Sequence, residues 1–343
     1  MKKYITNLYG HSRSSTAMAA QHLVTSIAKQ EGYSEIRVGP YELENETVED
    51  KLKIIEGILS GVSKESIVIA QMPTWYGIVF DELLLQALRN RVENLVIFVH
   101  DFVPLMFLNN YYLFDRYISA YNLSDLIILP SKKMEERLVE KGLTSPVIYQ
   151  EVWDYQVSLP SLGSPEFQKN IKFSGNIERF PFVKTWNKTV PLEVFSEGNL
   201  SQSSTAVLKG WLSSDELLKS LNKGGFGLVW SENIENQNEK EYSEMNASFK
   251  FSAYLAAGLP LIVNQGLAKE SFVRDYRLGY IVSDLDQAVD YITNTSSKEY
   301  AQLLVNVKQV NSLITDGFFT RKLLNQIQEA LFLRKKEESV DYL

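Results

Sequence analysis

A lysine at the start of a short helix is the side chain best placed to hold a negatively charged ligand. The run Asn246–Asn264 reads as a loop, a helix, a glycine stop and a buried strand. Ser248 suits the N-cap, and Gly258 stands where a left-handed C-cap is needed. Free N–H groups and the helix dipole concentrate positive charge in the first turn, where Lys250 adds a full charge. This combination predicts a bound anion such as a diphosphate, but a solvated lysine on an ordinary buried helix fits it equally well.

Arg179 is a second candidate ligand for phosphate. It follows an apolar strand and the turn Ser174-Gly175-Asn176, and a guanidinium fork matches paired phosphate oxygens. The alternatives are a salt bridge with Glu178 and an ordinary surface arginine. The position after a strand and a Gly-Asn turn favours phosphate. The residues expected to bind the phosphate ligand in this half of the chain are Arg179, Ser248, Phe249, Lys250, Phe251 and Ser252.

Two further residues have the chemistry and the position to contact a nucleobase, a phosphate or a sugar. Trp211 follows a strand and a glycine, where an aromatic ring can stack on a nucleobase, although a core tryptophan fits the same pattern. Thr16 lies between the first strand and the first helix, in a loop whose glycine and hydroxyls can approach a phosphate or a sugar. Simple N-capping also explains Thr16. The loop lacks the lysine and the spacing of a P-loop.

His100 and Asp101 follow an apolar strand and are the candidate proton acceptors. Open parallel sheets bind their ligands at the edge formed by the carboxyl ends of the strands. A reaction in which a hydroxyl group attacks another centre needs one base to take the proton of that hydroxyl. Asp101 is the first choice and His100 the second, while the alternative for Asp101 is a turn. The aromatic run 107–121 lines an acceptor site, forms a subunit contact or packs in the core.

Strand and helix patterns alternate along the chain and predict α/β architecture. Short, continuously apolar strands such as 66–70 indicate sheets covered on both faces, and the alternation indicates parallel, doubly wound sheets. Turn-rich residues 158–165 interrupt the pattern and predict a linker. The expected strands are 3–9, 35–39, 66–70, 94–100, 126–130 and 147–151, then 170–174, 192–196, 206–210, 226–230, 261–264 and 280–283. A long helical region, 298–336, is expected to break near Asp316-Gly317.

Composition limits the possible functions. The 343 residues suggest two domains, and an apolar fraction of 45% is ample for their cores. A net charge of -7 argues against a general nucleic-acid binder. With no cysteine, disulfides, thiolate metal sites and cysteine nucleophiles are excluded. Neither a signal peptide nor a membrane span is recognisable, so a cytoplasmic protein is expected.

The sequence does not predict a metal-binding site. The three histidines, His11, His22 and His100, do not have the spacing of metal ligands. Asp284-Leu285-Asp286 matches the Asp-x-Asp pattern of metal-dependent GT-A transferases. It stands at the start of a helical pattern, however, so helix capping explains it better.

The order of motifs in the second half resembles the donor domain of GT-B glycosyltransferases. The motifs are Ser174-Gly175-Asn176, Leu208-Lys209-Gly210-Trp211, Gly225-Phe226-Gly227-Leu228-Val229-Trp230, the Lys250 helix, Ala256-Ala257-Gly258-Leu259-Pro260 and Leu278-Gly279-Tyr280. The whole chain, including the loop from Tyr9 to Ala17, is similar to a narrower group. These are the glucosyltransferases that act second in glycosylating serine-rich-repeat adhesins of Gram-positive bacteria, once described as nucleotide-sugar-synthetase-like.

The resemblance implies a GT-B fold in which two Rossmann-like domains face across a cleft. Residues 1–157 would form the acceptor-side domain, residues 166–312 the nucleotide-sugar domain, and residues 313–343 a helix that returns to the first. It also implies that Arg179 and Lys250 hold the UDP diphosphate, and that basic side chains replace a metal.

The implied reaction moves glucose from UDP-glucose to GlcNAc on Ser or Thr of a serine-rich-repeat protein. Other glycosyltransferases of the same pathway are expected partners, and a homo-oligomer is expected. The alternatives are a GT-B transferase with another sugar or acceptor, and a non-catalytic partner that helps another transferase. A pure chaperone would need neither Arg179 nor Lys250, so an enzyme is favoured.

Overall fold

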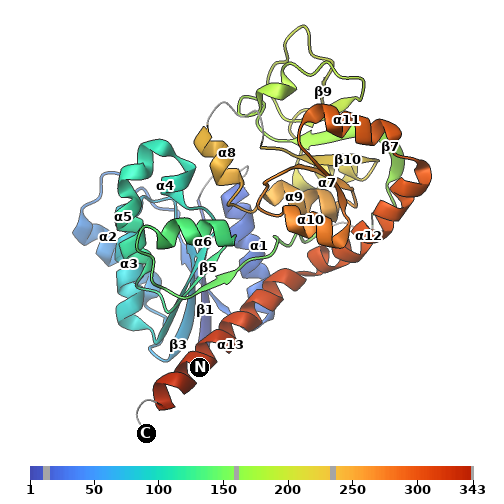
Figure 1. The fold of residues 1–343 in the computed structure, drawn as a ribbon. Coiled ribbons are helices and arrows are strands. Elements are labelled where there is room, and N and C mark those ends of the chain that lie inside the picture. Colours follow the sequence, from blue (N-terminus) through green and yellow to red (C-terminus); the bar gives the residue numbers. More distant parts are fainter. Residues whose placement is uncertain (11–15, 158–161, 232–236, 341–343) are drawn as a thin grey trace. The chain divides into compact units, whose positions relative to one another are not determined.

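The chain folds into two units, each built on a parallel sheet (Figure 1). The computed structural model describes residues 1–10, 16–157, 162–231 and 237–340. One unit combines Met1–Glu151 with Phe319–Leu343, and the other is Val152–Phe318. The sequence-based domain ends, 157 and 312, fall a few residues from these positions. Part of the predicted linker, residues 158–161, lies outside the described residues. In the described part of the chain, no helix has the length and apolar character needed to cross a membrane.

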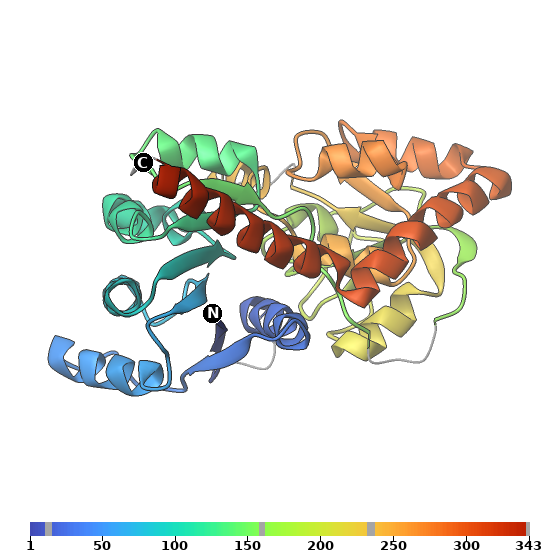
Figure 2. The same ribbon diagram turned by 90° about the horizontal axis from the view of Figure 1, so that it is seen from below.

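The described residues of the first unit form a six-stranded parallel sheet in the order β2-β1-β3-β4-β5-β6. Its strands are β1 (Lys2–Leu8), β2 (Ser34–Val38), β3 (Ser66–Met72), β4 (Asn94–Val99), β5 (Leu126–Leu129) and β6 (Val147–Tyr149). Its helices are α1 (Thr16–Gln30), α2 (Val48–Leu59), α3 (Ile78–Arg91), α4 (Val103–Met106), η1 (Leu108–Leu113), α5 (Phe114–Tyr121), α6 (Lys132–Val139) and α13 (Phe318–Val340). Helices cover both faces of this sheet, with α3 and α5 on one side and α1 and α13 on the other (Figures 1 and 2).

The strand order reverses between β1 and β3, and this position fixes where the unit binds ligands. The connection through α1 leads from β1 outward to β2, and the connection through α2 returns to β3 on the other side of β1. Loops that leave the carboxyl ends of such strands diverge and leave room for a ligand. Thr16 follows β1 and His100 follows β4, so both belong to this edge of the sheet.

The last helix belongs to the first unit. The long helical region breaks at Gly317, whose φ of +83° ends α12 (Ser297–Asp316) in the left-handed region, as the sequence predicts. Beyond the break, α13 buries an apolar stripe at helical spacing: Phe319, Leu323, Leu324, Ile327 and Leu331. Polar contacts add to this packing, because Arg321 Nε lies 3.0 Å from Glu31 Oε1 and Lys322 pairs with Glu151.

In the second unit the described residues form another six-stranded parallel sheet, in the order β12-β11-β10-β7-β8-β9. The strands are β7 (Glu166–Ser174), β8 (Leu192–Phe195), β9 (Val207–Leu208), β10 (Gly224–Val229), β11 (Leu261–Asn264) and β12 (Gly279–Val282). The helices besides α12 are η2 (Pro181–Val183), α7 (Ser214–Leu221), α8 (Gln237–Ser243), α9 (Phe249–Ala256), α10 (Glu270–Tyr276) and α11 (Leu285–Asn294). Every strand predicted from the sequence is present.

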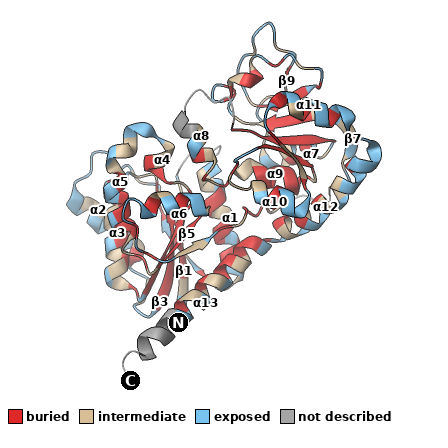
Figure 3. Ribbon diagram, in the orientation of Figure 1, coloured by how far each residue is buried: buried red, intermediate tan, exposed pale blue. Residues whose placement is uncertain are grey.

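Successive residues of β10 point to opposite faces of the second sheet and show what packs on each face. Phe226 and Leu228 lie in the core cluster that includes Ala288 and Ile292 of α11. Gly227 points the other way, where a Cβ atom would lie 2.5 Å from the ring of Tyr254 on α9. The inner strands β3, β4, β5, β10 and β11 are accordingly buried, while the edge strands β2, β6, β9 and β12 are partly exposed (Figure 3). Gly227 is therefore required by the close approach of α9 to the sheet.

Asp81, in the first turn of α3, is a buried carboxyl group of the first unit. Its Oδ1 accepts hydrogen bonds from the Thr74 hydroxyl and, at 3.2 Å, from the Thr74 backbone N–H. Its Oδ2 has no hydrogen-bond partner among the described residues. Burial raises the pKa of Asp81 from its usual value near 4 to about 7.

The raised pKa of Asp81 predicts a pH-dependent stability. The folded state holds a proton that the unfolded state has already lost between pH 4 and pH 7, so the free energy of unfolding falls as pH rises through that window. Asp81→Asn cannot ionise and should lack this fall, which is at most about 1.4 kcal/mol per pH unit. Denaturant unfolding at pH 5, 6, 7 and 8 measures it, with Asp275→Asn as the control for losing an exposed carboxylate. Parallel pH profiles for wild type and Asp81→Asn would contradict the prediction.

Candidate functional site

The first turn of α9 presents Lys250 as the sequence predicts. Ser248 is the N-cap residue, and Gly258 has a φ of +81° just past the helix end. The Ser248 side chain makes no capping hydrogen bond to any described residue. The Phe251 N–H donates to the Ser248 carbonyl at 3.1 Å, but the hydroxyl leaves the N–H groups before it to other acceptors. The helix dipole adds positive charge beside Lys250.

The Lys250 ammonium lies against two aromatic rings. Its Nζ is 4.9 Å from the ring centroid of Phe173, at the end of β7, and 4.4 Å from that of Phe180. The rings meet edge to face, with centroids 5.0 Å apart and an interplanar angle of 75°. Within the described ranges, no hydrogen bond or ion pair reaches the ammonium. Aromatic faces attract a cation without pairing with it, so the charged form of Lys250 stays open to an anion.

Gly175 allows the turn after β7 to close on this ammonium. A Cβ atom at position 175 would lie 3.0 Å from the Phe173 ring and 3.2 Å from Lys250 Nζ. The preceding residue is fixed by α9 itself, because the backbone N–H of Ser174 donates to the Tyr254 hydroxyl at 2.8 Å. Lys250 and Tyr254 are four residues apart on α9 and lie on the same face of the helix. That face therefore carries the ammonium and also holds the chain turn that follows β7.

Burial, followed by repulsion from Arg179, lowers the pKa of Lys250 to about 7. Although the side chain is only partly buried overall, its charged end lies in the protein-lined recess described above. The lysine is thus divided between its charged and neutral forms near neutral pH. A bound anion would favour the charged form, so anion binding and protonation are coupled.

Arg179 lies close enough to Lys250 to share its ligand. Its side chain is exposed, and its guanidinium carbon is 5.8 Å from the Phe180 ring centroid. The alternative salt bridge with Glu178 does not form, because Glu178 pairs with Lys184. The structure therefore brings Arg179 and Lys250 together around Phe180.

The other first-turn residues differ in what they can offer a ligand. Phe249 is partly buried and packs near Tyr155, with ring centroids 5.2 Å apart. Phe251 is buried in the core. Ser252 is fully buried, and its Oγ has no hydrogen-bond partner among the residues that the structure describes. The Phe251 N–H already donates to the Ser248 carbonyl at 3.1 Å, so Phe251 and Ser252 offer a ligand one hidden hydroxyl but no exposed side chain.

Trp211 is not a core tryptophan. It follows Gly210, which has a φ of +77°, and 58% of its surface is exposed. The core alternative is wrong, and an indole face remains open to a nucleobase. Thr16 is the exposed first residue of α1. The preceding loop residues 11–15 lie outside the described residues, so the part of the sequence hypothesis that concerns them stays a prediction.

His100 is poorly suited to take a proton from an acceptor. It is buried directly after β4, and its Nε2–H donates to Gln71 Oε1 at 2.9 Å. The amide of Gln71 is held in turn by Thr6 and Thr25. Burial lowers the pKa of His100 to about 3, so the ring is neutral and weakly basic. Asp101 is only partly buried. Of the two candidates, Asp101 has the better access and chemistry for a general base.

The aromatic run 107–121 is divided between core and surface. Phe114, Tyr117, Ile118 and Tyr121 of α5 are buried, while Leu108 and Tyr112 of η1 are exposed over 62% and 79% of their surfaces. Core packing thus explains α5 only. In the second unit, Asp284 caps α11 by accepting from Gln287 N–H, which confirms the capping interpretation of the Asp-x-Asp sequence.

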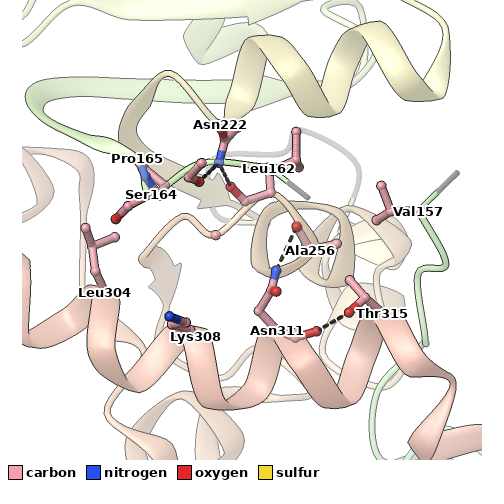
Figure 4. Close-up of a pocket in the computed structure, with 13 residues that line it drawn as sticks. Val157, Leu162, Ser164, Pro165, Asn222, Ala256, Leu304, Lys308, Asn311 and Thr315 are labelled. Carbon is pink, nitrogen blue, oxygen red and sulfur yellow. Dashed lines mark hydrogen bonds between the residues drawn. The ribbon is translucent and has the colours of Figure 1, made fainter. Parts of the chain in front are cut away.

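A cavity of about 530 Å³ lies at the other end of α9 (Figure 4). Its wall includes Ala256, Ala257, Gly258, Lys308 and Asn311. Asn311 Nδ2 donates to the carbonyl of Ala256 at 2.7 Å, as Figure 4 shows. Helix carbonyls give this end partial negative charge, which disfavours a phosphate. This cavity and the candidate anion site of the unit are therefore different places.

Comparison with known proteins identifies the family. Residues 2–152 match the family model for the glucosyltransferase 3-like N-terminal domain, and residues 171–327 match that for the C-terminal domain. Glucosyltransferase 3 of Streptococcus gordonii is 38% identical over 334 residues, which cover 96% of this chain and 100% of the relative. The chain belongs to the glucosyltransferase 3-like family. It is therefore a glycosyltransferase, which confirms the family and the enzyme class predicted from the sequence and excludes a purely non-catalytic partner.

Solved structures place this glucosyltransferase 3-like protein in the GT-B fold. A sucrose-phosphate synthase from Thermosynechococcus elongatus aligns with a TM-score of 0.65 at 11% identity, over 97% of this chain and 100% of that one. An alpha-glucosyltransferase in complex with UDP and DNA aligns with a TM-score of 0.59 at 12% identity, over 95% and 99%. The predicted fold of two doubly wound sheets is confirmed.

Sequence reasoning missed the residues that hold Lys250 in place. Phe173, Phe180 and Tyr254 look like ordinary core residues in an apolar pattern. The available signal was Gly175 directly after a strand, which indicates a close approach to the backbone without saying what approaches it.

The pKa of Lys250 predicts that affinity for UDP falls as pH rises. UDP should bind the charged lysine and raise its pKa, so affinity is greatest below pH 7 and falls above it, by up to about tenfold per pH unit for one proton. Calorimetric titrations from pH 6 to pH 9 measure the change. Lys250→Arg is the matched control because arginine stays charged, so its profile reports ionisation of UDP alone. Equal slopes for wild type and Lys250→Arg would contradict the prediction.

Proposed function

We propose that this protein transfers glucose from UDP-glucose to GlcNAc that is O-linked to Ser or Thr of a serine-rich-repeat protein. The observation that carries the proposal is the Lys250 ammonium, held at the start of α9 by two aromatic rings with Arg179 nearby. The name of the Streptococcus gordonii relative supports glucose as the sugar. The alpha-glucosyltransferase of the same fold, solved with UDP, supports a UDP-sugar donor.

The electrostatics fit the departure of a nucleoside diphosphate. As the sugar leaves, negative charge develops on the β-phosphate. Lys250, Arg179 and the N–H groups at the start of α9 stabilise that charge with groups that are already oriented, which is where preorganisation contributes most. Trp211 stacks on the uracil in this proposal, and Thr16 contacts the phosphate or the sugar. Basic side chains take the place of a metal ion.

Asp101 is the proposed general base for an inverting transfer. It removes the proton of the acceptor hydroxyl as the oxygen attacks the anomeric carbon and the bond to UDP breaks. We further propose that the protein works in the cytoplasm as a homo-oligomer, alongside the glycosyltransferases that supply its GlcNAc-bearing acceptor.

Substitution of the proposed base and substitution of the proposed phosphate ligand should affect sugar transfer and UDP binding differently. Asp101→Asn should slow transfer by roughly 10²–10⁴-fold, the usual contribution of a general base, and leave UDP affinity unchanged. Lys250→Ala should weaken UDP by about tenfold to a hundredfold, the loss of one charge-assisted contact, and leave uridine affinity unchanged. Radiolabelled sugar transfer and calorimetry give the two quantities. Asp115→Asn, which removes an exposed carboxylate of α5, is the control for Asp101.

The donor and the acceptor are tested with small panels. UDP-glucose should be used in preference to UDP-galactose and GDP-glucose, and a GlcNAc-bearing serine-rich peptide in preference to the bare peptide. A preference for another sugar or another acceptor would contradict the proposed substrates and leave a different glycosyl transfer as the activity. Full activity of Asp101→Asn would exclude Asp101 as the base, and unchanged UDP affinity in Lys250→Ala would remove the diphosphate assignment.

A further inference from the structure

Phe180 is the ring that both proposed phosphate ligands share. Its centroid lies 4.4 Å from Lys250 Nζ and 5.8 Å from the guanidinium carbon of Arg179. The two cations repel each other, as the lowered pKa of Lys250 reflects. An aromatic face beside each cation offsets part of that repulsion. A carboxylate in the same place would offset more of it, but a diphosphate would then have to displace an ion pair.

The position of Phe180 is fixed by its own packing. Only 6% of its surface is exposed, and it meets Phe173 and Phe182 edge to face with centroids 5.0 Å and 6.3 Å away. The short loop between β7 and η2 also holds its backbone, since Phe180 N–H donates to the carbonyl of Ile177 at 3.3 Å. The ring therefore has one orientation, and the two cations are arranged around it.

We propose that Phe180 is a positioning residue for the donor, whose ring keeps the Lys250 ammonium charged and close to Arg179 without supplying a counter-ion. This role rests on the proposed function. It concerns the free protein, because the ring favours the charged lysine before any anion arrives. Loss of the ring should therefore matter most at high pH, where the lysine is least protonated. At low pH the lysine is charged with or without the ring.

Phe182 provides a matched control. It belongs to the same aromatic cluster, 5.2 Å from Phe173 and 6.3 Å from Trp186 between centroids, but no cation of the described residues lies over its ring. Phe182→Leu and Phe180→Leu remove the same atoms from one core. A purely structural contribution of Phe180 would thus appear equally in both variants.

The experiment measures UDP and uridine affinity of the full-length protein at pH 6 and pH 8.5. Phe180→Leu should weaken UDP by about tenfold at pH 8.5 and by much less at pH 6, and uridine affinity should not change. Phe182→Leu should bind both ligands like wild type. If Phe180→Leu does not fold, trifluorophenylalanine at position 180 keeps the shape but weakens the negative ring face, and the same substitution at position 182 is its control.

The outcomes separate this inference from the proposed function. Equal losses in the two leucine variants, a loss that is the same at both pH values, or a parallel fall in uridine affinity would overturn the role of Phe180 and leave the function intact. Wild-type protein that binds neither UDP nor UDP-glucose would overturn both. Unchanged UDP affinity with the fluorinated ring at position 180 would likewise overturn the role of Phe180.

Discussion

An ammonium group that has no counter-ion among the described residues is the constraint around which the second unit is organised. Burying the charged end of Lys250 is unfavourable, and its pKa falls as a result. The fold keeps the lysine there by surrounding it with aromatic faces and by closing a glycine turn over it. A fold selected for stability alone would place a carboxylate or a leucine at this position. The arrangement is understandable if stability is given up locally for an anion that binds later.

Two buried polar side chains of the first unit contrast with each other. One is held in a network of hydrogen bonds, and the other, like Lys250, is buried at a cost to stability. His100 is enclosed in a network with Gln71, Thr6 and Thr25, where its hydrogen bond fixes the strand ends. Such a network stabilises one conformation, and it removes the histidine from proton transfer at neutral pH. Asp81 instead keeps an unpartnered oxygen in the interior, so its ionisation opposes folding. Buried polar groups thus serve structure at one position and leave strain at another.

The sequence predicted the elements well because their signals are local. Strand periodicity, the caps at Ser248 and Gly258 and the break at Gly317 depend on neighbouring residues alone, and the structure has each of them. The short helices α4, α5 and α8 were missed.

Of the candidate site, only the charged side chains were predictable from the sequence. A lysine in a first turn and an arginine after a Gly-Asn turn are recognisable in one dimension, but the rings that hold them resemble core residues. Burial also separates residues that adjoin in the sequence: His100 is enclosed while Asp101 is partly exposed, and Trp211 lies on the surface. Such differences depend on which elements pack above a strand end, and no local pattern encodes that.

The far end of α9 explains how its first turn can be held accurately. Asn311 of α12 donates to the carbonyls of both Leu255 and Ala256 at 2.7 Å, and Asn222 donates to that of Ala257 at 3.0 Å. These bonds satisfy carbonyls that a helix end leaves open, and they fix the helix along its axis. Tyr254 then fixes its rotation, because its ring fills the space at Gly227 and its hydroxyl holds Ser174. A helix of only eight residues is too short to be rigid by itself, so the position of Lys250 is set by contacts made at the opposite end.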